Sequence, residues 1–163
     1  MKKLVAIMLS AVLALSFTAC SKQSAKAQMP NPFADCKTIE DAEKIAGFHV
    51  TAPDKIPEGY TQSIIQAIKD DLVQIIYKDG ENEITFRQGK DSEGNGDISG
   101  DYNQYKEKNT IMTGDLKVLI RGNDGKVSNA VWTNGEHAFS ITANPGETGL
   151  DKNVILSMID SIR

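Results

Sequence analysis

From Tyr60 onward, the sequence is dominated by short segments rich in Ile, Val and aromatic residues, and short turns separate these segments. Asp79-Gly80 and Asn134-Gly135 are typical hairpin turns. Because short turns can join only antiparallel neighbours, the pattern predicts an antiparallel sheet. We expect its strands at residues 60–69, 72–78, 83–88, 110–113, 116–121, 126–133 and 137–143.

Several of these segments are apolar on both faces. Alternation along the strand at residues 72–78 puts Leu72 and Ile76 on one face of the sheet and Val73, Ile75 and Tyr77 on the other. A sheet with two apolar faces needs cover on both, or it curls around itself.

Two amphipathic helices are expected near the ends of the domain. Residues 38–46 follow a helical period, with Thr38 as the N-cap and Gly47 as the stop. In the closing segment, Thr148 and Asp151 have the spacing of a capping box. A short extended piece at residues 48–52 follows the first helix. The closing helix carries an apolar stripe of Leu150, Val154, Ile155, Met158, Ile159 and Ile162.

The expected fold class is therefore α+β. It is a single curved antiparallel sheet of about six to eight strands, with a short N-terminal helix and a C-terminal amphipathic helix.

Residues 1–19 have the features of a secretory signal peptide. Lys2 and Lys3 give a positively charged start, and residues 4–15 form an apolar stretch that only Ser10 interrupts. This stretch has about 12 residues, whereas a membrane span needs about 20. An uncleaved N-terminal anchor helix is the alternative interpretation.

The end of this signal, Phe17-Thr18-Ala19-Cys20, resembles a bacterial lipobox, although Leu usually stands where this chain has Phe17. The resemblance implies that Cys20 carries a diacylglyceryl thioether and anchors the protein in the membrane. Ordinary cleavage nearby would instead leave Cys20 free or paired with Cys36.

The expected domain boundaries follow from these features. Residues 20–32 would be the lipidated cysteine and a flexible tether, because they are small and polar, contain prolines and lack an apolar period. Residues 33–163 would form a single extracytoplasmic α+β domain. If Cys20 is lipidated, Cys36 has no partner in the chain, and we expect it to be buried.

Charge argues against a nucleic-acid partner, because 18 Lys and Arg residues stand against 22 Asp and Glu residues. Cleavage before Cys20 would remove Lys2 and Lys3, which takes the formal charge from −4 to −6. An acidic domain is not held at an anionic membrane by its charge, so the lipid on Cys20 would do the anchoring, on the outer face of the cell membrane.

Sequence motifs for catalysis are missing. The two histidines, His49 and His137, lie in no zinc-binding motif, and the chain has no G-x-S-x-G motif. We expect His137 on a strand face and Trp132 in the core, and we expect no cofactor and no metal.

Residues 97–105 form the densest cluster of polar and aromatic residues in the chain. One interpretation is an ordered loop, in which Ser99 and Asp101 bond to backbone groups, Gly100 adopts a positive φ, and the tyrosines pack. The other interpretation is a patch for a ligand or partner, since tyrosines and amides suit recognition. Its candidate residues are Asp97, Ser99, Asp101, Tyr102, Asn103 and Tyr105.

The segment at residues 91–97 imitates the early part of a calcium-binding EF-hand loop, with Asp91, Glu93, Asn95 and Asp97 as oxygen donors. Tyr102 stands where that loop needs a bidentate Glu. A solvated turn is therefore the favoured interpretation.

Several short motifs occur together along residues 31–163: the opening Asn31-Pro32-Phe33, Asp41-Ala42-Glu43 to Gly47-Phe48, Pro57-Glu58-Gly59-Tyr60, residues 97–105, Ala130-Val131-Trp132-Thr133 and the final helix. With these motifs the chain resembles a family of Gram-positive lipoproteins with an extracytoplasmic domain of unknown function, also seen as the outer part of some anti-sigma factors. The resemblance implies no enzymatic activity.

The leading functional hypothesis is a lipid-anchored, non-catalytic binding or accessory module outside the cytoplasm. A carrier or sensor of lipid or cell-wall fragments, using a concave sheet face, is one alternative. An acidic hydrolase with paired carboxylates among Asp97, Asp101 and Glu107 is another.

Overall fold

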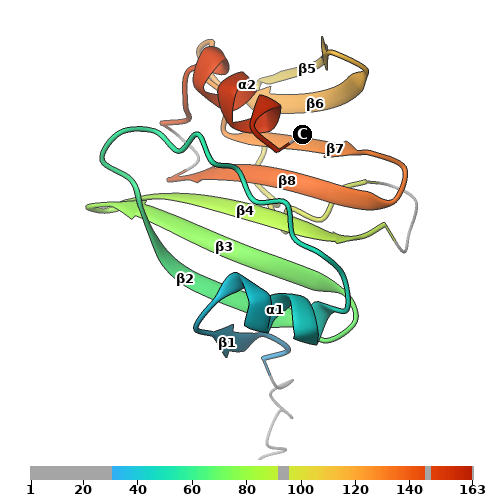
Figure 1. The fold of residues 1–163 in the computed structure, drawn as a ribbon. Helices are drawn as coiled ribbons and strands as arrows, with labels where there is room; N and C mark the ends of the chain where they lie inside the picture. Colours follow the sequence, from blue (N-terminus) through green and yellow to red (C-terminus); the bar gives the residue numbers. More distant parts are fainter. Residues whose placement is uncertain (1–30, 92–95, 146–147, 163) are drawn as a thin grey trace, which may run out of the picture. The chain divides into compact units, whose positions relative to one another are not determined.

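Antiparallel strands form one eight-stranded sheet in the computed structural model of the protein, which describes residues 31–91, 96–145 and 148–162. The spatial order is β1-β2-β3-β4-β8-β7-β6-β5 (Figure 1). The strands are β1 (Ala34–Cys36), β2 (Thr61–Ile68), β3 (Leu72–Asp79), β4 (Asn82–Lys90), β5 (Glu107–Thr113), β6 (Leu116–Gly122), β7 (Asn129–Thr133) and β8 (His137–Asn144). The expected α+β fold, with one antiparallel sheet and a helix near each end, is confirmed.

The strand order departs from the chain order at one place. Strand β4 pairs with β8, while β5 lies at the far edge of the sheet. The connection from β4 to β5 must therefore pass the positions of β8, β7 and β6. We call its described part, residues 96–106, the crossing loop.

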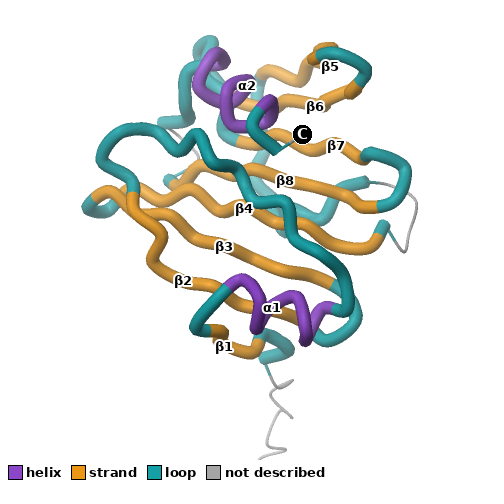
Figure 2. The backbone as a smooth tube through the Cα atoms, in the orientation of Figure 1, coloured by secondary structure: helices purple, strands orange, loops and turns teal. Residues whose placement is uncertain are grey.

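One face of the sheet, the apolar face, carries the core and both helices. Helices α1 (Ile39–Ala46) and α2 (Lys152–Asp160) lie on this side, with the segment between α1 and β2 running across it (Figures 1 and 2). The expected alternation is confirmed, because Val73, Ile75 and Tyr77 are buried in this core. Further core residues are Ile84, Phe86, Trp132, Phe139, Ile141, Ile155, Met158 and Ile159.

Two side chains of β7 and β8 occupy the positions expected of them. Trp132 is 3% exposed and stacks on Phe139 at 5.3 Å between ring centroids. His137 lies on a strand and packs against Phe48 at 4.8 Å. Both serve packing, as expected.

The opposite face, the polar face, carries side chains that alternate with the core residues along the same strands. One row in the strand register runs from Asp35 through Gln66, Gln74 and Arg87 to Ser140. A neighbouring row joins Thr85, Thr142, Asn129 and Arg121. Charged and amide groups on a covered face need hydrogen-bond partners, which decides how the crossing loop packs.

The expected extended piece at residues 48–52 lies outside the sheet, where the Val50 N–H donates to Glu43 and the Thr51 N–H donates to Gln88, so side chains replace a strand partner. Some strands differ from the expectation. The short strand β1 was not predicted. Strand β7 begins at Asn129 rather than at residue 126, because Val127 pairs instead with Leu150 in an isolated bridge.

The two helix starts differ in their capping. Thr38 caps α1 as expected, since its hydroxyl accepts from the Asp41 N–H at 3.2 Å, and Gly47 ends the helix with φ 77°. The capping box expected for α2 is wrong, because Asp151 makes no side-chain cap bond. Its carboxylate instead pairs with Lys126 at 2.7 Å, and Thr148 donates to the Pro145 carbonyl.

We predict that Phe86→Ala lowers the free energy of unfolding by about 3–5 kcal/mol, because Phe86 is fully buried between the sheet and its cover. The matched control is Met112→Ala on the edge strand β5, where the side chain is 63% exposed and the change should be within about 0.5 kcal/mol. Urea unfolding of both variants measures the difference. Equal losses would contradict this assignment of the core.

Candidate functional site

The crossing loop is attached to the polar face by two arginines that stand in the middle of strands. Arg87 comes from β4 and Arg121 from β6. The Arg121 side chain bonds to the loop at Asp97, and the Arg87 side chain bonds to it at residues 98 and 99. Neither arginine is among the candidate residues predicted from the sequence.

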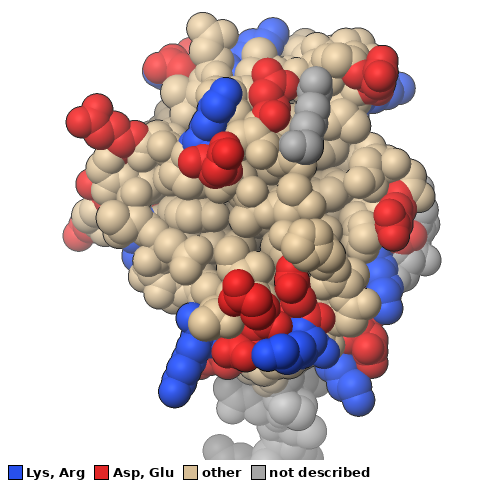
Figure 3. All heavy atoms as spheres, in the orientation of Figure 1, with Lys and Arg blue, Asp and Glu red and all other residues tan. Residues whose placement is uncertain are grey.

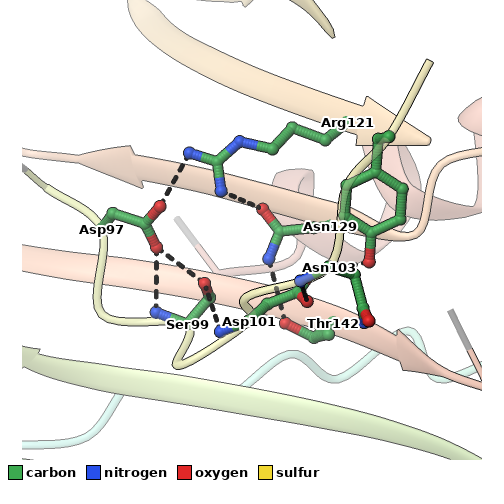
Figure 4. Close-up of polar contacts among 8 residues, drawn as sticks. Asp97, Ser99, Asp101, Asn103, Arg121, Asn129 and Thr142 are labelled. Atoms are coloured by element: carbon green, nitrogen blue, oxygen red, sulfur yellow. Dashed lines mark hydrogen bonds and ion pairs between the residues drawn. The ribbon is translucent and has the colours of Figure 1, made fainter. Parts of the chain in front are cut away.

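Arg121 holds the loop through an ion pair. Its Nη2 donates to Oδ2 of Asp97 at 2.7 Å, and its Nη1 donates to Oδ1 of Asn129 at 3.2 Å (Figure 4). Asn129 is fully buried, and its Nδ2 donates to the Thr142 hydroxyl at 3.2 Å. The ion pair is therefore fixed from the sheet side by a polar network.

Arg87 holds the loop through its backbone. Its Nη1 donates to the carbonyls of Ile98 at 3.1 Å and Ser99 at 2.7 Å, and its Nε donates to Oε1 of Gln74 at 2.8 Å. The ring of Phe33 lies 5.8 Å from the guanidinium carbon. Burial lowers the pKa of the Arg87 guanidinium, while Tyr102 acts to raise it.

The orientation of Arg87 is set by a ladder of amides across the sheet. Gln74 donates to Gln66 at 3.0 Å, and Gln66 donates to Asp35 at 2.8 Å. An amide that donates at one end and accepts at the other is held in one orientation. Strands β1, β2 and β3 thus hold the oxygen that receives the Arg87 Nε–H.

Within the loop, short side chains hold the backbone in consecutive turns. Oδ1 of Asp97 accepts from the N–H of Ser99 at 3.1 Å and from its hydroxyl at 2.7 Å. The Ser99 hydroxyl accepts from the Asp101 N–H, and Asp101 accepts from the Asn103 N–H. Gly100 has φ 62°. The expectation of an ordered loop built on these side chains is confirmed (Figure 4).

The two tyrosines of the loop behave differently. The Tyr105 hydroxyl donates to Oδ2 of Asp101 at 2.7 Å, and burial together with this bond raises the pKa of Tyr105 to about 12. Tyr102 is 92% exposed, so the expectation that it packs is wrong. It stands in the turn that the Asp101 carboxylate closes on the Asn103 N–H.

A polar hollow of about 470 Å³ lies between the crossing loop and the sheet. Strands β3, β4 and β8 form one wall and residues 99–103 form the other. Of the six candidate residues, Ser99, Asp101, Tyr102 and Asn103 line it. Asp97 and Tyr105 stand behind them and hold the loop in place.

The three carboxylates considered for hydrolysis do not share one hollow. Asp101 lines the polar hollow, whereas Glu107 lines a different one of about 140 Å³ and accepts from the Gly125 N–H. Asp97 is paired with Arg121. The second carboxylate in the polar hollow is Glu83, which is paired with Lys78 at 3.3 Å.

The imitation of a calcium loop falls partly outside the described residues, because Glu93 and Asn95 belong to the segment 92–95. Among its described members, Asp91 accepts from the Gly96 N–H, and Asp97 is paired with Arg121. The described part of the chain holds no group of three carboxylate, histidine or cysteine side chains that could bind a metal.

Of the two cysteines, Cys20 also lies outside the described residues. Cys36 is only partly buried at the edge strand β1, with its thiol 3.6 Å from the Ala34 carbonyl, so the expected burial is incomplete. This partial burial raises the pKa of the Cys36 thiol. An edge strand of three residues leaves one side of the thiol uncovered.

The side of the domain that carries the helices offers a smaller and more apolar cleft. It has a volume of about 270 Å³ and lies beside α2, with Leu116, Trp132, Phe139, Ile159 and Ile162 in its walls. Figure 3 shows that charged residues cluster around the two helices and leave an uncharged band between them.

A signal for the two overlooked residues is present in the sequence. The chain has three arginines, and Arg87 and Arg121 both lie inside predicted strands. Each alternates with core residues, so each must face the side opposite the core. A sheet that is covered on both faces cannot leave such residues in open water.

Comparison with known proteins gives one match. A protein-family model described as "Domain of unknown function (DUF4367)" matches residues 50–162. No curated protein and no solved structure matches the chain. The matched range contains the crossing loop, both arginines and the polar hollow.

We predict that Asp97 makes folding stability depend on pH in the acid range. Burial acts to raise the pKa of Asp97, but its bonds to Ser99 and Arg121 outweigh burial and lower it. Below about pH 4 the unfolded chain therefore binds more protons than the folded one, and this stabilisation is lost as the pH falls through the folded-state pKa.

Urea unfolding of Asp97→Asn at a series of pH values tests this. The variant should be less stable at neutral pH and should lose less stability than wild type on acidification. The control Asp124→Asn removes an exposed carboxylate in the turn after β6 and should follow wild type. An Asp97→Asn protein whose stability falls as steeply as that of wild type would contradict the pairing.

We also predict that Gly100→Ala loosens the crossing loop. A Cβ at this position would lie 2.5 Å from Nη1 of Arg87, in addition to the strain of a positive φ. Gly96→Ala is the matched control, with φ 68° and nothing within 4 Å of its Cβ. Gly100→Ala should cost about 1–3 kcal/mol more than the control and speed hydrogen exchange at residues 97–103. Equal effects would argue against the contact.

Proposed function

Given that this chain belongs to the DUF4367 family, we propose that it is a lipid-anchored extracytoplasmic lipoprotein whose domain is a non-catalytic binding module, with the polar hollow as its ligand site. The observation that carries the binding role is a polar hollow whose loop wall is bonded to the sheet by Arg87 and Arg121.

The proposed anchor rests on the sequence of the first 32 residues. A positive start, an apolar stretch and Phe17-Thr18-Ala19-Cys20 together match a lipoprotein signal. No helix in the described residues is long and apolar enough to cross a membrane. A thioether-linked lipid on Cys20 would hold the domain at the outer face, on a tether of about 12 residues.

Rigidity of the walls supports a binding role for the hollow. Its sheet wall consists of central strands, and its loop wall is bonded to that sheet through Arg87 and Arg121. Ligand sites are usually preformed, because ordering a loop at the moment of binding costs conformational entropy. A volume of about 470 Å³ lies within the ordinary range of about 300–1,000 Å³ for small-molecule sites.

The two alternatives receive less support. An apolar carrier would need an open apolar face, but helices and buried side chains occupy that face, and the cleft beside α2 is smaller, at about 270 Å³. A hydrolase would need two carboxylates free to act on one substrate. In the polar hollow, Glu83 is paired with Lys78, and Asp101 accepts bonds from Asn103 and Tyr105.

A role beside other envelope proteins fits the same proposal. The resemblance of the sequence to lipoproteins and to the outer parts of anti-sigma factors supports a location outside the membrane. A binding module there would present its ligand, or report its presence, to a partner.

We predict that protein isolated from its own host is heavier than the polypeptide starting at Cys20, by the mass of the attached lipid, and enters the detergent phase in a cloud-point separation. Cys20→Ser should lose both properties because it removes the sulfur that carries the thioether. Cys36→Ser is the matched control and should keep both. Intact-mass spectrometry and phase partitioning are the measurements.

Protein of unmodified mass that stays in the aqueous phase would refute the anchor. Retention of the lipid in Cys20→Ser would refute the assignment of the attachment site.

A further inference from the structure

One nitrogen of the Arg87 guanidinium has no hydrogen-bond partner among the described residues. Its Nε and Nη1 are used by Gln74, Ile98 and Ser99, and Nη2 makes no hydrogen bond to any residue that the structure describes. Arg87 is half-buried and lines the polar hollow. It therefore offers a fixed N–H donor to anything that enters.

The charge of Arg87 is not balanced by an ion pair in the described part of the chain. Arg121 differs, because its charge is met by Asp97 at 2.7 Å. A half-buried cation without a counter-ion is unfavourable, so an anionic group on Nη2 would be bound more strongly than at an exposed arginine. Arg87 is also the one cationic side chain among the described residues that line this hollow.

Nearby carboxylates limit how much negative charge the ligand can carry. Glu83 and Asp101 both line the hollow. Glu83 is held by Lys78, and Asp101 by the Asn103 N–H and the Tyr105 hydroxyl. Their charge would repel a dianion such as a phosphate monoester, whereas a single carboxylate on Arg87 is repelled less.

The remaining lining is suited to neutral polar groups. Thr85 and Thr142 supply hydroxyls, and Asn103 and Asn144 supply amides that can both donate and accept. Tyr102 stands 92% exposed at the rim, where its ring can cover the less polar side of a ligand. A ligand rich in hydroxyl or amide groups matches these walls.

We propose that the polar hollow binds a small ligand that carries one carboxylate together with hydroxyl or amide groups, with the carboxylate on Nη2 of Arg87 and the body of the ligand under Tyr102. This inference rests on the proposed function and specifies its ligand class. An acidic sugar and the C-terminal end of a short peptide share this chemistry.

The test uses two pairs of probes that differ only at the carboxylate. N-acetylmuramic acid is compared with its carboxamide, and N-acetyl-Ala-Ala with its C-terminal amide, by calorimetric or NMR titration of the full mature chain. At least one acidic probe should bind about tenfold more tightly than its neutral counterpart. The pair that shows the difference identifies the sugar or the peptide as the source.

A variant of Arg87 and a control outside the hollow then test the ligand contact. Arg87→Lys keeps the charge but cannot place an N–H at the Nη2 position, and should weaken binding of the acidic probe about tenfold. Lys117→Ala is the control: it removes an exposed cation of β6 that does not line the hollow, and should leave the dissociation constant within about twofold. Hydrogen exchange at residues 97–103 checks that the loop keeps its place in both.

Tyr102→Ala covers the case in which Arg87→Lys does not fold. Its side chain is exposed, so the variant should keep wild-type stability and bind the acidic probe several-fold more weakly.

Three results would overturn the inference: no acidic probe binds, an acidic probe and its neutral counterpart bind equally, or neither Arg87→Lys nor Tyr102→Ala weakens binding. If an acidic probe and its neutral counterpart bind equally and Tyr102→Ala weakens both, the role of the carboxylate is refuted, but the proposal that the hollow is a binding site stands. The lipid anchor is tested independently, by the mass of protein isolated from its own host. Failure of the proposed anchor is therefore distinguishable from failure of the ligand inference.

Discussion

Arg87 stands at the point where the sheet, the crossing loop and the polar hollow meet. It lies on β4 between Phe86 and Gln88, which are both buried on the apolar face, so its side chain must leave on the polar face, where the loop covers it. A covered guanidinium requires acceptors, and the structure supplies an amide oxygen from β3 and two loop carbonyls. The place of the loop is therefore set by hydrogen bonds to arginine rather than by apolar packing.

Arg121 complements this arrangement on the far side of the loop. Its ion pair with Asp97 fixes the loop where it passes β6, and Asn129 joins that pair to the strands beneath. Directly after the two attachments the backbone turns at Gly100, and residues 99–103 form the loop wall of the hollow. The hollow thus lies beside the point where the two arginines fix the loop to the sheet.

Much of the sheet could be predicted because its strands are separated by short turns and follow a period of two. The burial of Val73, Ile75 and Tyr77, the N-cap at Thr38 and the core position of Trp132 all followed from local pattern. The placement of β5 at the edge did not, because no local pattern tells where a long connection ends. Residues 48–52 join no strand, because Glu43 and Gln88, 7 and 37 residues away in the chain, accept from two of their N–H groups.

The site could be predicted only in part, because local sequence patterns report contacts between sequence neighbours and not contacts between distant residues. The turns of residues 97–105 depend on neighbours in sequence, so Ser99, Asp101 and Gly100 could be read from their types. Arg87 and Arg121 act across distances of 11 to 24 residues, and their partners include backbone carbonyls that carry no sequence signal.

Nuclear magnetic relaxation of the backbone amides of Ser99 and Asp101 tests most directly whether two arginines turn this loop into a fixed wall. The account predicts order parameters of about 0.85, equal to those of β4 and β8. Values below about 0.6 at these amides, with rigid strands beside them, would contradict it.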